Sequence, residues 1–250
     1  YILSNKKRAV LSALLIYTLV FLLFAACSII PVIIHTGAFL ASDGIAMYYP
    51  YLLDFRSNTI DFIESIKSGN PELTMINFDF LFGSDTISTS TLIFVPFLPY
   101  YFFSAFIPES AIPMFFAIGV VLLSYIAGLS FIYLCSYYKK NLLWSGFLAA
   151  FYVFCGNYFY TGALNPHFLY MFIGFPLMIV GMDRIIKNKG CALYVLSTAW
   201  VATAGMPFVG YTGPFVGVFA IIRVYYCYKG HFWKNLGKYF LRGSLFTVLG

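Results

Sequence analysis

The sequence predicts an all-α integral membrane protein, a single domain of helices that cross a bilayer several times. Of its 250 residues, 61% are apolar and only 10% are charged, whereas soluble domains carry about 25% charged residues. Its apolar stretches are continuous, and several are long enough to cross a hydrocarbon core of about 30 Å. Because lipid offers no partner to backbone N–H and C=O groups, such stretches are expected to be helical.

The first apolar run, 9–34, predicts a membrane-spanning helix that is retained rather than cleaved as a signal peptide. Lys6, Lys7 and Arg8 precede it. Because cytoplasmic loops carry an excess of Lys and Arg, these residues place the N-terminus in the cytoplasm. Residues 35–110 are then expected to form a large loop on the outer side of the membrane.

Further apolar runs predict five more spans and the beginning of a seventh, and they cover residues 111–138, 142–160, 166–183, 192–210, 212–228 and 239–250. The chain starts at Tyr1 without a methionine, and it ends at Gly250 inside the last of these runs. We therefore expect it to be part of a longer protein.

Residues 91–107 form an apolar run that is interrupted by Pro96 and Pro99 and ended by Pro108. If this run does not cross the membrane, 13 of the 15 Lys and Arg residues lie in the cytoplasm, whereas 12 lie outside if it does. The excess of positive charge in cytoplasmic loops therefore favours a re-entrant or interfacial segment. Eight of the nine Asp and Glu residues then lie in the outer loop, and Asp183 is the exception.

Within the outer loop, residues 54–68 predict an amphipathic helix. Apolar side chains recur at every third position, and charged side chains lie on the other face. The apolar set is Ile60, Ile63 and Ile66, and the charged set is Asp61, Glu64 and Lys67. Gly69 and Pro71 follow as stop signals. Such a helix is typical of the membrane–water interface.

Asp43, which follows the first span in the sequence ASDGIAMYYPY, is the candidate catalytic residue. Its carboxylate is a candidate general base that takes a proton from an acceptor hydroxyl. The alternative role is a helix cap or an Asx turn before Gly44. Tyr48 and Tyr49 are candidate substrate-binding residues, because aromatic rings stack on sugar faces. Their alternative role is in the aromatic belt of the membrane interface.

Three further residues are candidate substrate ligands. Arg56 suits a phosphate group through bidentate hydrogen bonds, or it pairs with an acidic neighbour in solvent. Asn165 and His167 flank Pro166 at an outer helix start. Asn165 fits a helix N-cap there, and His167 either faces the same cavity as Asp43 or lies at the interface.

No cofactor follows from the sequence, although Asp43 with Asp79 or Asp85 could hold a divalent metal. These carboxylates have no tight ligand spacing, and the five scattered cysteines predict neither a disulfide framework nor a metal cluster. Basic residues are spread over short loops, which argues against a nucleic-acid partner despite the net charge of +6. Gly213 and Gly217 form a small-xxx-small pair that predicts helix packing.

Short motifs are spread over most of the chain. They are Ser42-Asp43-Gly44 with Tyr48-Tyr49-Pro50, Phe82-Gly83, Tyr152 with Gly156-Asn157, Asn165-Pro166-His167-Phe168, and Phe175-Pro176-Leu177 with Gly181-Met182-Asp183-Arg184. As a set they resemble the N-terminal half of the YfhO family of bacterial membrane proteins. That family is similar in architecture to GT-C glycosyltransferases, which carry a large first extracytoplasmic loop with surface helices on a polytopic helix bundle.

The resemblance implies that a sugar moves from a polyprenyl-phosphate donor to an envelope glycopolymer, such as a teichoic acid, outside the bacterial cytoplasmic membrane. By this resemblance, Asp43 corresponds to the catalytic aspartate of the family, and Tyr48 and Tyr49 correspond to the tyrosines that follow it. Ser42 occupies a position where the family pattern has glycine.

Membrane lipid is a further expected partner of such a transferase. Two other interpretations of the function stay open. A flippase or transporter of a lipid-linked substrate usually has ionisable residues near the bilayer midplane, and no charged residue is central in any predicted span. A non-catalytic envelope-assembly protein would use Asp43 only as a cap.

Overall fold

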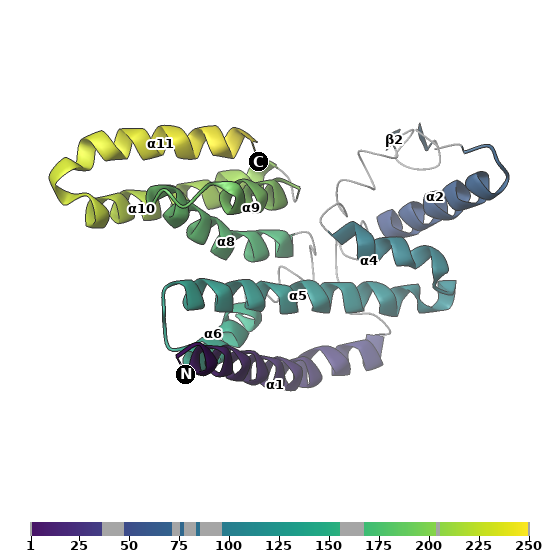
Figure 1. Ribbon diagram of the computed structural model, residues 1–250. Coiled ribbons are helices and arrows are strands. Elements are labelled where there is room, and N and C mark those ends of the chain that lie inside the picture. Colours follow the sequence, from purple (N-terminus) through teal and green to yellow (C-terminus); the bar gives the residue numbers. More distant parts are fainter. Residues whose placement is uncertain are drawn as a thin grey trace.

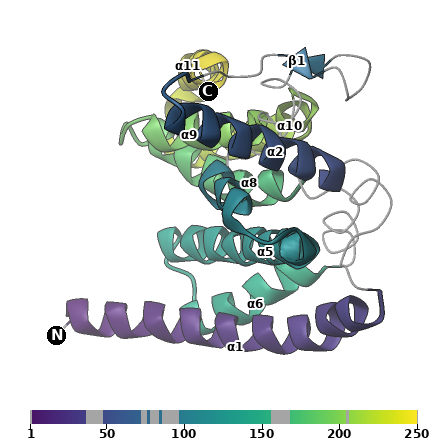
Figure 2. The same cartoon turned by 90° about the vertical axis from the view of Figure 1, so that its right-hand side faces the viewer.

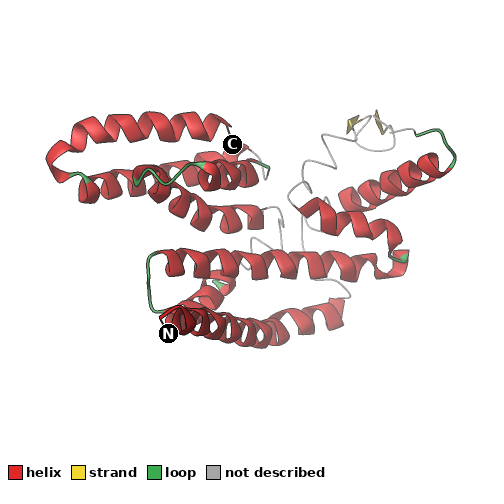
Figure 3. Ribbon diagram, viewed as in Figure 1, coloured by secondary structure: helices red, strands yellow, loops and turns green. Residues whose placement is uncertain are grey.

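The computed structural model describes residues 2–36, 48–71, 76–77, 84–85, 97–155, 168–203 and 206–249. For residues 2–7, 32–36, 76–77, 84–85 and 206–208, only the backbone is described. The longer helices are α1 (Ile2–Thr36), α2 (Tyr49–Lys67), α5 (Ile112–Tyr137), α6 (Leu142–Phe154), α8 (Leu169–Ile186), α9 (Ala192–Ala202), α10 (Met206–Cys227) and α11 (Phe232–Leu249). The short elements are α4 (Leu98–Phe102), the 3-10 turns η4 (Phe103–Phe106), η5 (Glu109–Ala111) and η7 (Lys229–His231), and the strands β1 (Ile76–Asn77) and β2 (Ser84–Asp85), which pair antiparallel. Figure 3 shows how strongly helix dominates the chain.

Three of the described helices are long and apolar enough to cross a membrane. They are Arg8–Pro31, Glu109–Tyr137 and Leu169–Ile186, with mean hydropathies of 2.6, 2.3 and 1.6. Leu142–Phe154 and Ala192–Ala202 are apolar but shorter. The described part of the chain therefore agrees with the predicted all-α membrane class.

The long helices stack in layers (Figures 1 and 2). Helices α1 and α6 pack together at one side, and α5 separates them from α8. Helix α8 pairs with α9 and contacts α10, and α11 packs on α10 and α9. The main hydrophobic core runs through all these layers, with fully buried side chains such as Tyr17, Leu123 and Met178.

Four chain segments gather at one end of the bundle, which we call the basic end. They are the N-terminus of α1 and the short turns 138–141, 187–191 and 228–231. Because each turn is so short, the helices that it joins run in opposite directions, and α2 and α4 lie toward the other end (Figure 1). The turns carry Lys139, Lys140, Lys187, Lys189 and Lys229.

Close helix packing depends on glycines other than the pair Gly213 and Gly217 for which it was predicted. A Cβ at Gly181 of α8 would lie 2.6 Å from the backbone N of Tyr194 in α9, and a Cβ at Gly128 of α5 would overlap the ring of Tyr17. At Gly213 and Gly217, by contrast, a Cβ would meet no described atom within 4 Å. The close packing predicted for this pair is therefore not found within the described part of the chain.

Several helices begin at other residues than the sequence predicts. Helix α2 starts at Tyr49 rather than 54, because Pro50 fits the first turn, where the missing N–H costs nothing. Helix α10 starts at Met206 and continues through Pro214, so residues 206–210 belong to α10 and not to the preceding helix. Helix α11 already starts at Phe232, seven residues before the apolar run at 239.

The described part of the predicted segment 91–107 is a pair of short helical turns, α4 and η4, that pack against α2. At about 1.5–2 Å per residue, its ten residues from Phe97 to Phe106 span far less than the roughly 30 Å of a hydrocarbon core. Residues 91–96 lie outside the described residues, so the interfacial or re-entrant position of the whole segment stays a prediction.

Candidate functional site

The predicted substrate-binding residues Tyr48 and Tyr49, at the start of α2, lie in or against a small second core, which we call the aromatic platform. It forms where α2 packs on α4, on η4 and on the first turns of α5. Its buried members are Tyr48, Tyr51, Leu52, Phe55, Tyr101, Ile112 and Phe116. The platform is separate from the main core, and it lies away from the basic end (Figure 1).

The two predicted sugar-binding tyrosines differ in how much of each ring is accessible. Tyr48 is 6% exposed and packs inside the platform. Tyr49 is only half-buried, and its ring meets that of Phe116 edge to face, with 6.4 Å between centroids. Burial, and then the negative charge of Glu109, raise the pKa of Tyr49. Tyr49 is thus neutral at pH 7, and it presents ring surface that a sugar could contact.

Arg56 of α2 holds the short turn η4 in place. Its Nε donates a hydrogen bond to the carbonyl of Ser104 at 3.0 Å, and its Nη2 donates to the carbonyl of Ile107 at 3.1 Å. The Ser104 carbonyl also accepts a hydrogen bond from the backbone N–H of Ile107 at 3.2 Å. The guanidinium therefore adds a second donor to Ser104 and one donor to Ile107 at the end of the turn. These bonds use two of its five N–H donors. The sequence left an acidic neighbour as the alternative partner of Arg56. Among the described residues, Arg56 instead bonds to backbone carbonyls.

A wall of aromatic rings borders the platform beside α4. The rings of Tyr100 and Phe115 stack with 4.4 Å between centroids, and those of Phe97 and Tyr100 with 4.9 Å. The Tyr100 hydroxyl donates to the carbonyl of Phe115. Burial raises the pKa of Tyr100 to about 12. The wall therefore offers flat, uncharged surfaces next to α2.

An apolar cleft of about 270 Å³ opens between α6, α8 and α10. It lies near the C-terminal end of α6 and the first turns of α8 and α10, away from the basic end. Its lining residues are Tyr152, Met171, Phe172, Phe175, Tyr211, Thr212 and Phe215. The Tyr152 hydroxyl donates to the carbonyl of Phe172 at 2.9 Å and so ties α6 to α8. The walls thus accept hydrocarbon far better than a charged group.

Several predicted site residues lie outside the described residues. They are Asp43, Asn165, His167 and Asp79, while Asp85 is described only as backbone of β2. The structure therefore does not test the predicted base or the metal alternative. The described residues contain no group of three His, Cys, Asp or Glu side chains that could hold a metal ion.

The structure shows a second polar centre that the site prediction missed. Asp183 of α8 is fully buried, and its carboxylate pairs with Lys187 and with Arg223 of α10, each at 2.5 Å. The Tyr137 hydroxyl of α5 donates to it at 2.7 Å. We call these four residues the Asp183 network. Its signal in the sequence is that Asp183 is the single acidic residue beyond Glu109.

The Asp183 network joins three helices near the basic end, far along α5 from the aromatic platform. Each negative oxygen has a cationic partner, and Lys187 and Arg223 are each about one-third exposed. A fully paired carboxylate has no role as a proton acceptor, so the network fits helix anchoring rather than chemistry.

No protein-family model, curated protein or solved structure shows significant similarity to this chain. The resemblance to the YfhO family therefore stays a prediction from the motifs.

Proposed function

We propose that the protein is a membrane glycosyltransferase of GT-C type in the bacterial cytoplasmic membrane. It moves a sugar from a polyprenyl-phosphate donor to an envelope glycopolymer, such as a teichoic acid. One observation carries the proposal: an apolar cleft and an aromatic platform both lie away from the basic end. A lipid-linked sugar needs both surfaces, because its chain is hydrocarbon and its headgroup is polar.

The cleft suits part of a polyprenyl chain. Its volume of about 270 Å³ lies just below the range of about 300–1,000 Å³ that is typical of ligand pockets. It would therefore hold only a few isoprene units, and the rest of the chain would lie in the bilayer. The segment 156–167, which contains Asn165 and His167, connects the α6 wall to the α8 wall in sequence. These two residues are the proposed ligands of the donor headgroup.

The proposed chemistry needs one base and one stabiliser of negative charge. Asp43 takes the proton of an acceptor hydroxyl while that oxygen attacks the anomeric carbon. The bond between the anomeric carbon and the phosphate oxygen breaks, and lipid phosphate leaves with the electron pair. A well-placed base accelerates such a step by about 10²–10⁴-fold. The remaining N–H donors of Arg56 are proposed to stabilise the phosphate, and Tyr49 is proposed to stack on the sugar.

The arrangement of charges supports an outward-facing platform. The short turns that join antiparallel helices carry their lysines at the basic end, and positive charge in short loops is typical of the cytoplasmic side. Helix α2 then lies at the outer interface, as proposed for the surface helices of a GT-C-type loop.

The test is transfer of radiolabelled sugar from a polyprenyl-phosphate donor to envelope polymer in membranes that contain the full-length protein. Asp43→Asn is compared with the wild type at matched expression, and Asp61→Asn, an exposed aspartate on α2, is the control. We expect Asp43→Asn to lose at least 100-fold of the activity and the control to lose none. Equal activity in wild type and Asp43→Asn would remove the assigned base. Movement of the labelled lipid across the bilayer without transfer would support a flippase instead.

A further inference from the structure

The C-terminal part of the chain carries strong positive charge without compensation. After Asp183 the sequence contains eight Lys and Arg residues and no Asp or Glu. Two of the eight, Lys187 and Arg223, pair with Asp183. The other six have no acidic partner among the described residues; they are Arg184, Lys189, Lys229, Lys234, Lys238 and Arg242.

Three of these cations share one face of α11. Lys234, Lys238 and Arg242 follow one another at a spacing of four residues, and all three are exposed. Like charges at this spacing repel each other along a helix, and a bound anion would relieve that repulsion. Beyond Arg242, α11 has no charged residue. The charged part of α11 therefore extends from Lys234 to Arg242 and begins next to the turn 228–231.

A cavity of about 280 Å³ lies between α11 and the turn 187–191, beside Arg242. Its other lining residues are Ile185, Asn188, Gly190, Cys191 and Phe246. A Cβ at Gly190 would meet no described atom within 4 Å, so the cavity is open there. The cavity thus has a cationic edge at Arg242 and an apolar edge at Ile185 and Phe246.

Hydrogen bonds hold the cavity in shape. Arg242 Nη1 donates to Asn188 Oδ1 at 3.1 Å, and Asn188 Nδ2 donates to the Tyr239 hydroxyl at 3.2 Å. The Tyr228 hydroxyl bonds to the Ile186 carbonyl and to the Tyr239 hydroxyl, each at 3.0 Å. The Lys238 ammonium lies 5.2 Å from the centre of the Tyr239 ring. Tyr239 thus keeps Lys238 and Arg242 close to the same turn.

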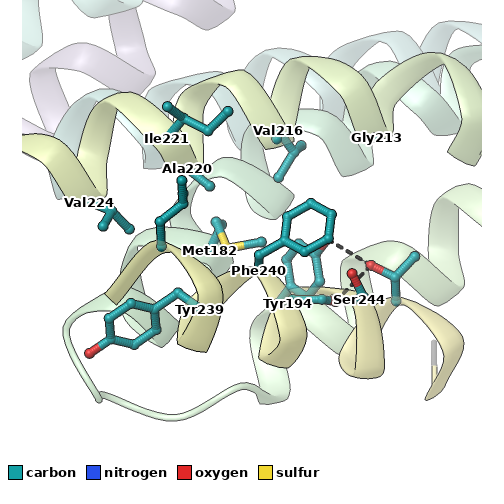
Figure 4. A pocket seen from close by; sticks show the side chains of 14 residues that line it. Met182, Tyr194, Gly213, Val216, Ala220, Ile221, Val224, Tyr239, Phe240 and Ser244 are labelled. Atoms are coloured by element: carbon teal, nitrogen blue, oxygen red, sulfur yellow. Dashed lines mark hydrogen bonds between the residues drawn. The ribbon is translucent and has the colours of Figure 1, made fainter. Parts of the chain in front are cut away.

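The surroundings of these cations are apolar. A second cleft of about 130 Å³ between α10 and α11, where Val216 and Ala220 face Phe240 and Ser244, opens on the other flank of α11 (Figure 4). On the flank of the cations, Leu241 and Leu245 are 73% and 57% exposed. A soluble polyanion would meet the cations alone, whereas a phospholipid would also cover this apolar surface. Basic pockets beside apolar helices are typical sites for anionic lipid headgroups.

We propose that the cavity between α11 and the turn 187–191 binds the phosphate of an anionic phospholipid. Arg242 is the main phosphate ligand, and Lys238 and Lys189 supply further positive charge. The acyl chains lie against Ile185 and Phe246 at the apolar edge of the cavity and continue over the exposed side chains of Leu241 and Leu245 of α11. This site is separate from the proposed site of sugar transfer and does not depend on it.

The test measures lipid binding by the full-length protein in detergent. Phosphatidylglycerol or phosphatidylcholine is added, and bound lipid is counted by native mass spectrometry while the melting temperature is followed. The double variant Arg242→Gln with Lys238→Gln is compared with Lys139→Gln and Lys140→Gln, which removes two exposed charges from another turn of the basic end. A basic side chain near an anionic lipid contributes about a factor of five in affinity. We therefore expect the first variant to bind phosphatidylglycerol about 25-fold more weakly and the control to bind it as the wild type does.

Three outcomes would overturn the proposal. An equal loss in both double variants would mean a diffuse surface potential rather than a site. Equal binding of phosphatidylcholine would mean that charge is not recognised. Equal thermal stabilisation by inorganic phosphate or by glycerophosphoglycerol would mean a soluble anion. Arg242→Lys, which keeps the charge, is expected to retain most of the binding, and melting without lipid shows that each variant is folded.

Discussion

Replacing Asp183 with asparagine is expected to destabilise the helix bundle by about 3 kcal/mol. The side chain keeps its shape, but its negative charge disappears between Lys187 and Arg223. In place of one anionic oxygen, an amide NH₂ then faces a cation or the Tyr137 hydroxyl. The substitution therefore changes charge with almost no change in volume.

The magnitude follows from the burial of the three partners. Removing one member of a fully buried ion pair costs about 3–5 kcal/mol. Asp183 is fully buried, but Lys187 and Arg223 are 32% and 29% exposed, so both cations can turn toward water. The cost thus lies near the lower limit of that range. Arg223→Gln leaves the carboxylate with Lys187 and Tyr137 and should cost about 2 kcal/mol. Tyr137→Phe removes one hydrogen bond to a charged group and should cost about 1.5 kcal/mol.

The assay is thermal unfolding of the purified protein in nanodiscs, followed by tryptophan fluorescence. For a chain of this length, 1 kcal/mol corresponds to about 2–4 °C in melting temperature, so Asp183→Asn should melt about 6–12 °C lower. The double variant Asp183→Asn with Arg223→Gln should lose less than the sum of the single losses, because the two side chains interact. A melting temperature of Asp183→Asn within 2 °C of the wild type would refute the reasoning, as would additive losses in the double variant.

Three further predictions concern packing, the turn η4 and the platform. Gly181→Ala should lower stability by about 2 kcal/mol, because the new Cβ would lie 2.6 Å from the Tyr194 backbone. Gly217→Ala is the control: its Cβ would meet no described atom within 4 Å, so its stability should stay within about 0.5 kcal/mol of the wild type. Equal melting temperatures of the two variants would contradict this. Arg56→Met removes two hydrogen bonds to backbone and should cost about 2 kcal/mol of stability. Lys67→Met, at an exposed position of the same helix, is the control. An unchanged melting temperature together with a 100-fold loss of sugar transfer would assign Arg56 to the phosphate alone. If the Tyr49 ring stacks on the sugar, Tyr49→Phe should keep the rate of sugar transfer within about threefold, and Tyr49→Ala should lower that rate about tenfold. An equal loss of rate in both variants would point to the hydroxyl group instead.

The helices that sequence reasoning located well are those with sharp ends. The predicted span 111–138 matches α5 (Ile112–Tyr137), because polar residues or a proline stand at both ends of a long apolar run. The boundary between α9 and α10 was harder to predict. Hydropathy is high on both sides of it, and glycine and proline occur both at 205–207 and at 213–214. In the structure, α9 ends at Ala202, and α10 begins at Met206 and keeps Pro214 inside.

Side-chain partners were not predictable, since they come from distant parts of the chain. Arg56 was expected to meet phosphate or a neighbouring acid, and its described partners are carbonyls 48 and 51 residues away. Asp183 stood out in the sequence as the isolated acidic residue and as part of a short motif, and neither observation predicted its partners. Two of these partners lie 40 and 46 residues away. Likewise, Gly213 and Gly217 form a helix-packing motif, but the motif alone does not predict whether another helix packs closely against these two glycines.

The sequence by itself determined the all-helical class of this protein, the approximate places of its long apolar helices and the grouping of basic residues in short turns. These properties follow from the apolar content and the charge of a continuous stretch of sequence. They do not depend on which residues that stretch contacts in the folded protein. Only the tertiary structure decided that Tyr48 is packed while Tyr49 is accessible, that Arg56 bonds to the end of η4, and that Asp183 joins three helices. Each of these depends on contacts between segments far apart in the chain, because packing brings them together at distances that local patterns do not encode.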